Sequence, residues 1–167
     1  GATMKDRPFM DKLNILTVQD FIWLNQELTG QRHKFSYATL EEAVYYQYSY
    51  GTSTQLHDQA ARLLTGFAKL CPFEAGSQAT AFAGMTAFLK INGVELTVQP
   101  EEAADWVRAR LSDSAGASDA IRTASVEESG HHDEPSSRLA MGGAISRYTA
   151  GLKALLDAEP ERPLAVK

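Results

Sequence analysis

Leu70-Cys71-Pro72-Phe73-Glu74-Ala75-Gly76-Ser77-Gln78-Ala79-Thr80-Ala81 is the stretch on which the predicted fold depends. Apolar side chains recur at helical spacing over residues 56–70 before it, and residues 82–93 after it are apolar on nearly all sides. A short turn therefore opens directly into a buried helix. Free backbone N–H groups and the positive end of a helix dipole gather at such a turn. We expect Gly76, Ser77 and Gln78 to form a candidate anion-binding turn.

The composition is that of an ordinary globular protein. The 167 residues are 44% apolar and 22% charged, which indicates one domain with a real core. Sixteen basic and twenty-one acidic side chains give a net charge of −5, so we expect no nucleic-acid partner. One cysteine excludes an internal disulfide. No apolar run approaches the roughly 20 residues of a membrane span, and no charged-then-apolar leader is seen. We expect no membrane partner and a cytoplasmic location.

The rest of the chain predicts further helices and little else. Thr17-Val18-Gln19-Asp20 is a capping-box pattern that begins one helix, and Thr39-Leu40-Glu41-Glu42 repeats it for a helix that Gly51 closes. Residues 94–98 alternate as a short strand, and Pro100 begins another helix. The predicted fold class is all-α, with a central buried helix, at most a short β segment and an extra C-terminal helix.

The end of the chain differs in composition from the part before it. Residues 117–128 suit a short helix, and a last helix is expected over residues 138–158. Its apolar residues recur at a spacing of 4, 3, 4, 3, which is a narrow seam for one partner helix: Met141, Ile145, Tyr148, Leu152 and Leu155. We predict a helical domain over 1–112, a linker or short helix with a loop over 113–136, and a C-terminal helix within 137–167. That helix packs on the domain or on a partner, and a homodimer through it is the second alternative.

The turn also resembles the active-site motif of the Fic/Doc family, in its Doc-like branch. That motif is His-x-Phe-x-Asp/Glu-Gly-Asn-Gly/Lys-Arg between two helices, and the Doc branch continues with Thr-Ala. The residues that match it are Pro72, Phe73, Gly76, Thr80 and Ala81. The likeness covers about residues 16–111 and implies a Fic/Doc-like helical bundle, in which Pro72, Phe73 and Thr80 are structural. Family members transfer AMP or a phosphate from a nucleotide to protein hydroxyls, with ATP and Mg²⁺ as cofactors.

The resemblance places unreactive residues at the catalytic positions. Cys71 stands where the family has its general base, and a thiol is mostly protonated at neutral pH. Ala75 stands at the metal-ligand position and Ala79 at the position of the Arg that neutralises phosphate charge. Losing a general base costs about 10²- to 10⁴-fold, and losing such an Arg roughly 10³- to 10⁵-fold. We therefore expect no catalytic residues, no metal and no cofactor, because ligands for ATP and Mg²⁺ are lost.

Several other features have a plain structural explanation beside a functional one. Cys71 is a core thiol or a nucleophile. His131-His132-Asp133-Glu134 offers metal-ligand types but is expected to be a solvated loop. Tyr45, Tyr46, Tyr48 and Tyr50 form an aromatic cluster, either an interaction surface or a core with two of them exposed. Thr123-Ala124-Ser125-Val126-Glu127-Glu128 matches only the first part of the inhibitory motif that restrains intact Fic proteins.

Three hypotheses for the function follow. The first is a catalytically degenerate Fic/Doc-like protein, a pseudoenzyme that binds a protein or ligand, in a setting related to toxin–antitoxin systems. The second is a transferase of AMP or phosphate with altered chemistry at Cys71 and the Gly76 turn. The third is a helical assembly module that uses the C-terminal helix.

Overall fold

The computed structural model describes residues 13–48, 55–128 and 136–158. Within them, eight α-helices and one pair of short strands make an all-α fold with a small β segment, as the sequence predicts. Along the chain the elements are α1 (Val18–Thr29), α2 (Tyr37–Tyr45), α3 (Leu56–Leu70), α4 (Ser77–Ile91), β1 (Val94–Leu96), the 3₁₀ turn η2 (Pro100–Glu102), α5 (Ala103–Arg108), α6 (Ser114–Thr123), β2 (Ser125–Glu127), α7 (Ser137–Arg147) and α8 (Thr149–Leu156).

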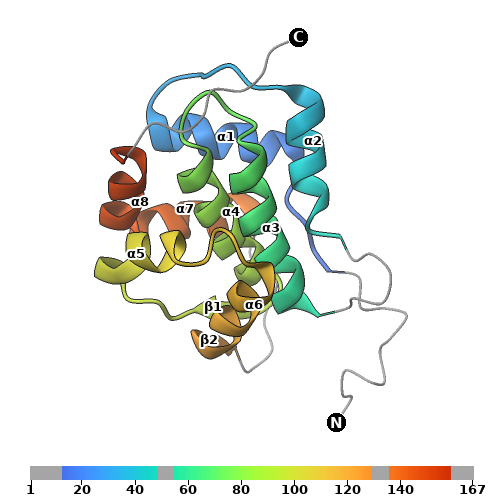
Figure 1. Cartoon of the computed structure of the whole chain (residues 1–167), viewed down its shortest axis with the longest axis vertical. Helices are drawn as coiled ribbons and strands as arrows, with labels where there is room; N and C mark the ends of the chain where they lie inside the picture. The colour runs from blue at the N-terminus through green and yellow to red at the C-terminus, as the bar shows by residue number, and fades with distance from the viewer. Residues whose placement is uncertain (1–12, 49–54, 129–135, 159–167) are drawn as a thin grey trace.

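Helix α4 is the centre of the bundle (Figure 1). Twelve of its fifteen residues are buried, and α1, α3, α7 and α8 all pack against it. A helix that is apolar on all sides has to be enclosed in this way, because no face of it gains from contact with water. The prediction of a central buried helix is confirmed.

The caps explain where α1 and α2 begin. The Thr17 hydroxyl accepts from the Asp20 N–H, and the Asp20 carboxylate accepts from the Thr17 N–H, which is the predicted capping box. Helix α2 begins earlier than predicted, because Ser36 rather than Thr39 is its N-cap. It also ends at Tyr45, so the predicted end at Gly51 is wrong.

The C-terminal region forms two helices instead of the predicted single one. The break lies at Tyr148, whose φ of −109° and ψ of 27° leave the helical region. Its buried hydroxyl donates to the Val98 carbonyl over 2.7 Å, which pulls the chain toward the segment after β1. Helix α8 then packs on α5 so closely that a Cβ at Gly151 would lie 2.8 Å from that of Ala103.

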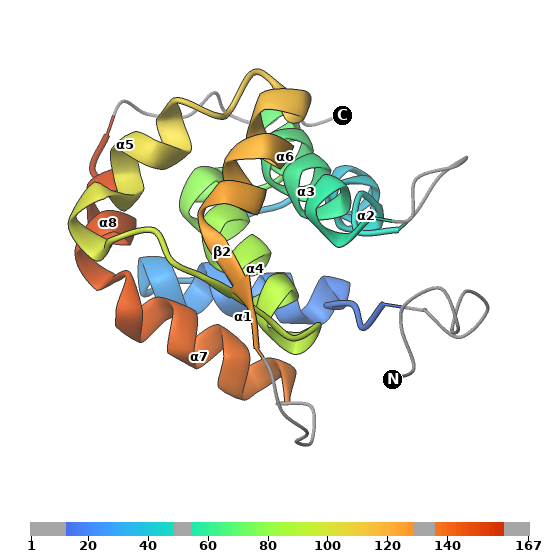
Figure 2. The ribbon, with the colours of Figure 1, turned by 90° about the horizontal axis from the view of Figure 1, so that it is seen from below.

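The seam along α7 and α8 packs inside the bundle. Met141, Tyr148, Leu152 and Leu155 are at most 3% exposed, and Figure 2 shows α7 running along one side of α4. These side chains are already covered by their own domain. A homodimer through this region stays a prediction, and it would have to use the outward faces of the two helices.

The sequence predicts the first strand of the β1–β2 pair but not the second. Residues Val94–Leu96 form β1, shorter than the predicted 94–98, and the predicted helix over 117–128 is α6 followed by the strand β2. The strands are antiparallel, with Glu95 opposite Val126.

None of the helices in the described part of the chain has the length and apolar character that a membrane span requires.

Candidate functional site

At each end of the turn between α3 and α4, one residue has a left-handed backbone conformation. Cys71 ends α3 with φ 44°, and its N–H donates to the Phe67 carbonyl over 3.1 Å. Gly76 precedes α4 with φ 78°. Positive φ is uncommon outside glycine, and Cys71 is the one non-glycine residue with it in the described part of the chain. The half-buried Cys71 thiol donates to the Ala68 carbonyl over 3.1 Å, so it faces its own helix end.

A short extended segment before α2 covers the first half of the turn. Phe35 and Phe73 form an antiparallel bridge, and their rings lie 5.7 Å apart. Glu74 is held to Lys34 twice: its N–H donates to the Lys34 carbonyl, and its Oε1 accepts from the Lys34 N–H, both over 2.9 Å. The carboxylate of Glu74 therefore serves as a cap for the neighbouring backbone.

The second half of the turn packs directly on α1 and α8. A Cβ added at Gly76 would lie 2.8 Å from the Thr29 methyl, 3.1 Å from the Asn25 amide nitrogen and 3.3 Å from Leu156. Asn25 Nδ2 donates to the Ala75 carbonyl over 2.9 Å and to the Thr80 hydroxyl over 3.2 Å. Asn25 thus fixes the position of the turn relative to α1. The sequence places Asn25 on the apolar face of α1, and that polar residue among apolar ones is the signal for its role.

The Ser77 side chain of the candidate anion turn points into the protein. Ser77 is fully buried, and its hydroxyl accepts from the Phe73 N–H over 3.1 Å and lies 3.3 Å from the Phe73 carbonyl. Gln78 is half-buried and has an interaction of its own. Anion binding at this turn stays a prediction.

Two of the positions that the Fic/Doc resemblance singles out, Ala75 and Ala79, carry only a methyl side chain. Ala79 is 0% exposed and belongs to the apolar core, and Ala75 is half-buried with its carbonyl bonded to Asn25. The expected structural residues lie in the interior: Pro72, Phe73 and Thr80 are all buried, and the Phe73 ring stacks on Phe67. In the described residues, no group of three metal-ligand side chains converges.

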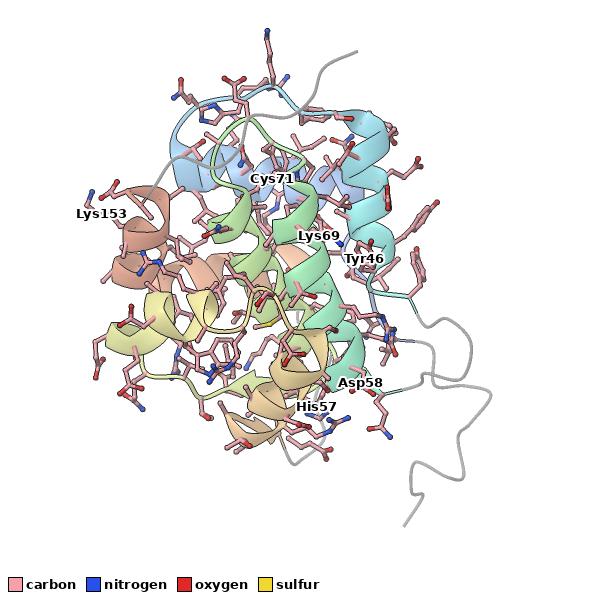
Figure 3. All side chains as sticks on the ribbon, viewed as in Figure 1. Tyr46, His57, Asp58, Lys69, Cys71 and Lys153 are labelled. Carbon is pink, nitrogen blue, oxygen red and sulfur yellow. The ribbon has the colours of Figure 1, made fainter. Side chains whose placement is uncertain are left out.

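Among the described residues, His57 is the base that the sequence offers for Cys71, and it does not lie beside that thiol. His57 lies at the other end of α3 (Figure 3), about 20 Å away by the rise of the helix. Burial first, and then the Arg122 guanidinium, lower the pKa of His57. Beside it, Asp58 accepts from the Ser118 hydroxyl and from Arg122, which ties α3 to α6. The hydrogen bond from Ser118 is the main cause that lowers the pKa of Asp58.

The tyrosine cluster is divided between the surface and the interior. Tyr45 and Tyr48 are 46% and 38% exposed and their rings lie 5.3 Å apart. Tyr37, the first residue of α2, is 55% exposed. The half-buried Tyr46 packs over Gly66, where a Cβ would lie 2.5 Å from the ring. Tyr50 and the His131-His132-Asp133-Glu134 loop lie outside the described residues.

The segment with part of the inhibitory motif lies at the far end of α4. Residues 123–128 form the end of α6 and the strand β2, and the Glu128 carboxylate accepts from Lys90 over 2.6 Å. A pocket of about 380 Å³ lies at the same end, between α4, β1 and α7. The sequence predicts neither, because the pocket is made by segments far apart in the chain.

Comparisons with models of protein families, with curated proteins and with solved structures found no match to this chain. The Fic/Doc resemblance therefore stays an expectation from the sequence.

Proposed function

We propose that this chain is a catalytically inactive protein of Fic/Doc type that works by binding a protein partner, in a setting related to toxin–antitoxin systems. One observation carries the catalytic half of the proposal: Ala79 is completely buried at the position where the resemblance calls for a phosphate-binding Arg. An Arg there would need both a charge partner and an open path to a ligand, and the residue packs in the core instead.

The polar groups around the turn support the same proposal. The hydroxyl of Ser77, the carboxylate of Glu74 and the amide of Asn25 all bond to backbone or side-chain groups of the protein itself. The Ser77 hydroxyl both donates to and accepts from Phe73, so it would have to give up one of those bonds, at about 0.5–1.5 kcal/mol net, to bind a phosphate.

The exposed tyrosines on α2 support binding as the mode of action. Tyr37 and Tyr45 are the first and last residues of α2, and Tyr48 follows in the turn after it, with its ring 5.3 Å from that of Tyr45. Tyrosine is enriched in protein–protein interfaces, because it buries a large apolar area and keeps a polar tip. The α2 face begins directly after the bridge between Phe35 and Phe73, so it adjoins the turn.

The catalytic half is tested with labelled ATP and Mg²⁺. We expect the purified full chain to transfer no label to itself or to an added protein mixture, and to show no ATP binding by calorimetry at millimolar nucleotide. Labelling that disappears in Cys71→Ala would overturn this half and favour the transferase with altered chemistry.

The binding half is tested by proximity labelling in the cell of origin. The double variant Tyr45→Ala/Tyr48→Ala is compared with Val126→Ala, which removes an exposed apolar side chain (54% exposed) from β2. We expect a reproducible set of partners with the wild-type chain and Val126→Ala, and loss of that set with the tyrosine double variant. Equal sets from all three proteins would show that the α2 face is not the binding surface.

A further inference from the structure

The pocket at the far end of α4 has mainly apolar walls. It lies between α4, β1 and α7, and Figure 2 shows α7 alongside α4. It is separated from the Gly76 turn by the length of α4, roughly 20 Å for fifteen residues. Six of its ten lining residues carry an apolar side chain or none: Val94, Leu96, Leu139, Ala140, Gly143 and Ala144.

The volume of the pocket sets the size of a ligand. An apolar cavity of about 150 Å³ holds one benzene ring, and ligand sites run from about 300 Å³ upward. At about 380 Å³, this pocket has room for a molecule of two fused rings.

The side of α7 that lines the pocket carries small residues at its middle. Gly143 has no side chain, and a Cβ added there would meet no atom within 4 Å. Its neighbours on that side, Ala140 and Ala144, offer one methyl group each. Walls that enclose unfilled space forgo dispersion contacts, so a ligand that fills the hollow supplies contacts that the chain itself does not make.

Leu139 connects the pocket with solvent. It belongs to the lining and is 72% exposed, so the α7 wall reaches the surface at this residue. A leucine in water leaves apolar area that a ligand beside it would cover, and covering such area is favourable.

The charged side chains at the pocket are paired with one another. Lys90 Nζ lies 2.8 Å from Glu95 and 2.6 Å from Glu128, and Arg147 lies 3.8 Å from Glu95. Two positive and two negative charges therefore cancel. A charged ligand would have to displace one of these pairs, or give up its own hydration without gaining a partner.

Thr86 supplies the remaining polar side chain of the lining. Its hydroxyl donates to the Phe82 carbonyl over 2.8 Å, so it has a partner within its own helix. Every polar side chain of the lining is thus partnered inside the protein, and the walls favour a ligand that gains by apolar contact.

We propose that this pocket binds an uncharged, mainly apolar small molecule about the size of two fused rings. Size follows from the volume, and the lack of charge follows from the paired ions at the walls. This inference does not depend on the function proposed for the turn or for the α2 face.

The test uses three probes with one two-ring skeleton and different charges: naphthalenemethanol, naphthoate and naphthylmethylammonium. Each is titrated into the full chain at neutral pH, and binding is followed by NMR. We expect naphthalenemethanol to bind with a Kd at or below about 1 mM, and both charged probes to bind at least about tenfold more weakly. The shifts should centre on Ala140 and Ala144.

Three variants locate the site, with thermal unfolding as a check of their folds. Gly143→Phe is designed to fill the pocket and should weaken naphthalenemethanol by about tenfold or more. Gly142→Phe adds the same ring at a neighbouring glycine that also has open space but does not line the pocket, and should change binding by less than about twofold. Leu139→Ala removes an exposed side chain and should weaken binding by about threefold or more.

Four results would overturn the proposal. They are no binding of naphthalenemethanol up to its solubility limit, a charged probe that binds as tightly, shifts that centre on α2 or on the Gly76 turn, and wild-type affinity in a folded Gly143→Phe. If Gly143→Phe does not fold, Leu139→Ala decides in its place, and unchanged affinity in that variant overturns the proposal.

Discussion

Asn25 is the residue whose removal tests the description of the turn most directly. It is 1% exposed, and its Nδ2 joins α1 to the Ala75 carbonyl and to the Thr80 hydroxyl. In Asn25→Ala, two hydrogen bonds worth about 0.5–1.5 kcal/mol each are lost, and each buried group left without a partner adds to the cost, by about 1–3 kcal/mol. Because the Ala75 position is only half-buried, water can replace part of that loss. We expect a total destabilisation of about 2–4 kcal/mol.

The measurement is urea unfolding at neutral pH, with the midpoint shifted and the slope unchanged. Gln26→Ala is the control: it lies on the exposed side of the same helix and should change stability by less than about 0.5 kcal/mol. A double-mutant cycle of Asn25→Ala with Thr80→Val should give a coupling of about 1 kcal/mol, since the two side chains share one hydrogen bond. A cost below about 1 kcal/mol for Asn25→Ala, or a coupling near zero, would refute the role of Asn25 as the link between α1 and the turn.

Three more predictions concern the packing and the charges. Gly84→Ala should destabilise the protein by about 1–3 kcal/mol, because the added Cβ would lie 2.3 Å from the Phe21 ring. Gly142→Ala, where the added Cβ meets open space, should stabilise the protein by about 0.5–1 kcal/mol. Thermal unfolding measures both changes. Tyr148→Phe removes the shorter of two hydrogen bonds to the buried Val98 carbonyl, which keeps only the 3.4 Å bond from Arg147, and should cost about 0.5–1.5 kcal/mol in urea unfolding; no loss would remove the explanation for the helix break. The pKa of Asp58 is lowered in the folded state, so the stability it contributes is present above its ordinary pKa near 4 and is lost as the pH falls through the folded value. Asp58→Asn should therefore show a flatter fall in stability between about pH 5 and 2 than the wild type, and equal pH profiles would contradict the assignment.

Local patterns were sufficient to predict the centre of the fold. The wide apolar stripe of α3, the apolar surface of α4 and the capping box at Thr17 each depend on residues close together in the chain. The break at Tyr148 could not be predicted in this way, because it depends on a hydrogen bond to Val98, fifty residues earlier. The strand β2 is equally hidden, since three residues carry no periodic signal and gain their structure from pairing with β1.

The candidate site shows the same division. The residue types at Cys71, Ala75 and Ala79 can be read from the sequence, and only the Fic/Doc resemblance, which stays a prediction, makes them a loss of catalytic groups. It does not indicate that Ser77 faces Phe73, or that Asn25 reaches the turn from α1, because both depend on how the helices pack. The pocket beside β1 is also invisible in the sequence, because its walls come from three segments that meet only in the folded chain.

The backbone N–H groups of a helix N-terminus are too weak an anion site to hold a nucleotide by themselves. The interaction of an anion with a helix N-terminus is typically worth 0.3–1 kcal/mol at an exposed site, and up to about 2 kcal/mol where it is partly buried. Micromolar binding needs about 8 kcal/mol, and even millimolar binding needs about 4. The difference would have to come from a cation, a metal or a polar side chain, but position 79 is a buried Ala and the Ser77 hydroxyl is bonded to Phe73. On this arithmetic, the first turn of α4 alone is a weak anion site.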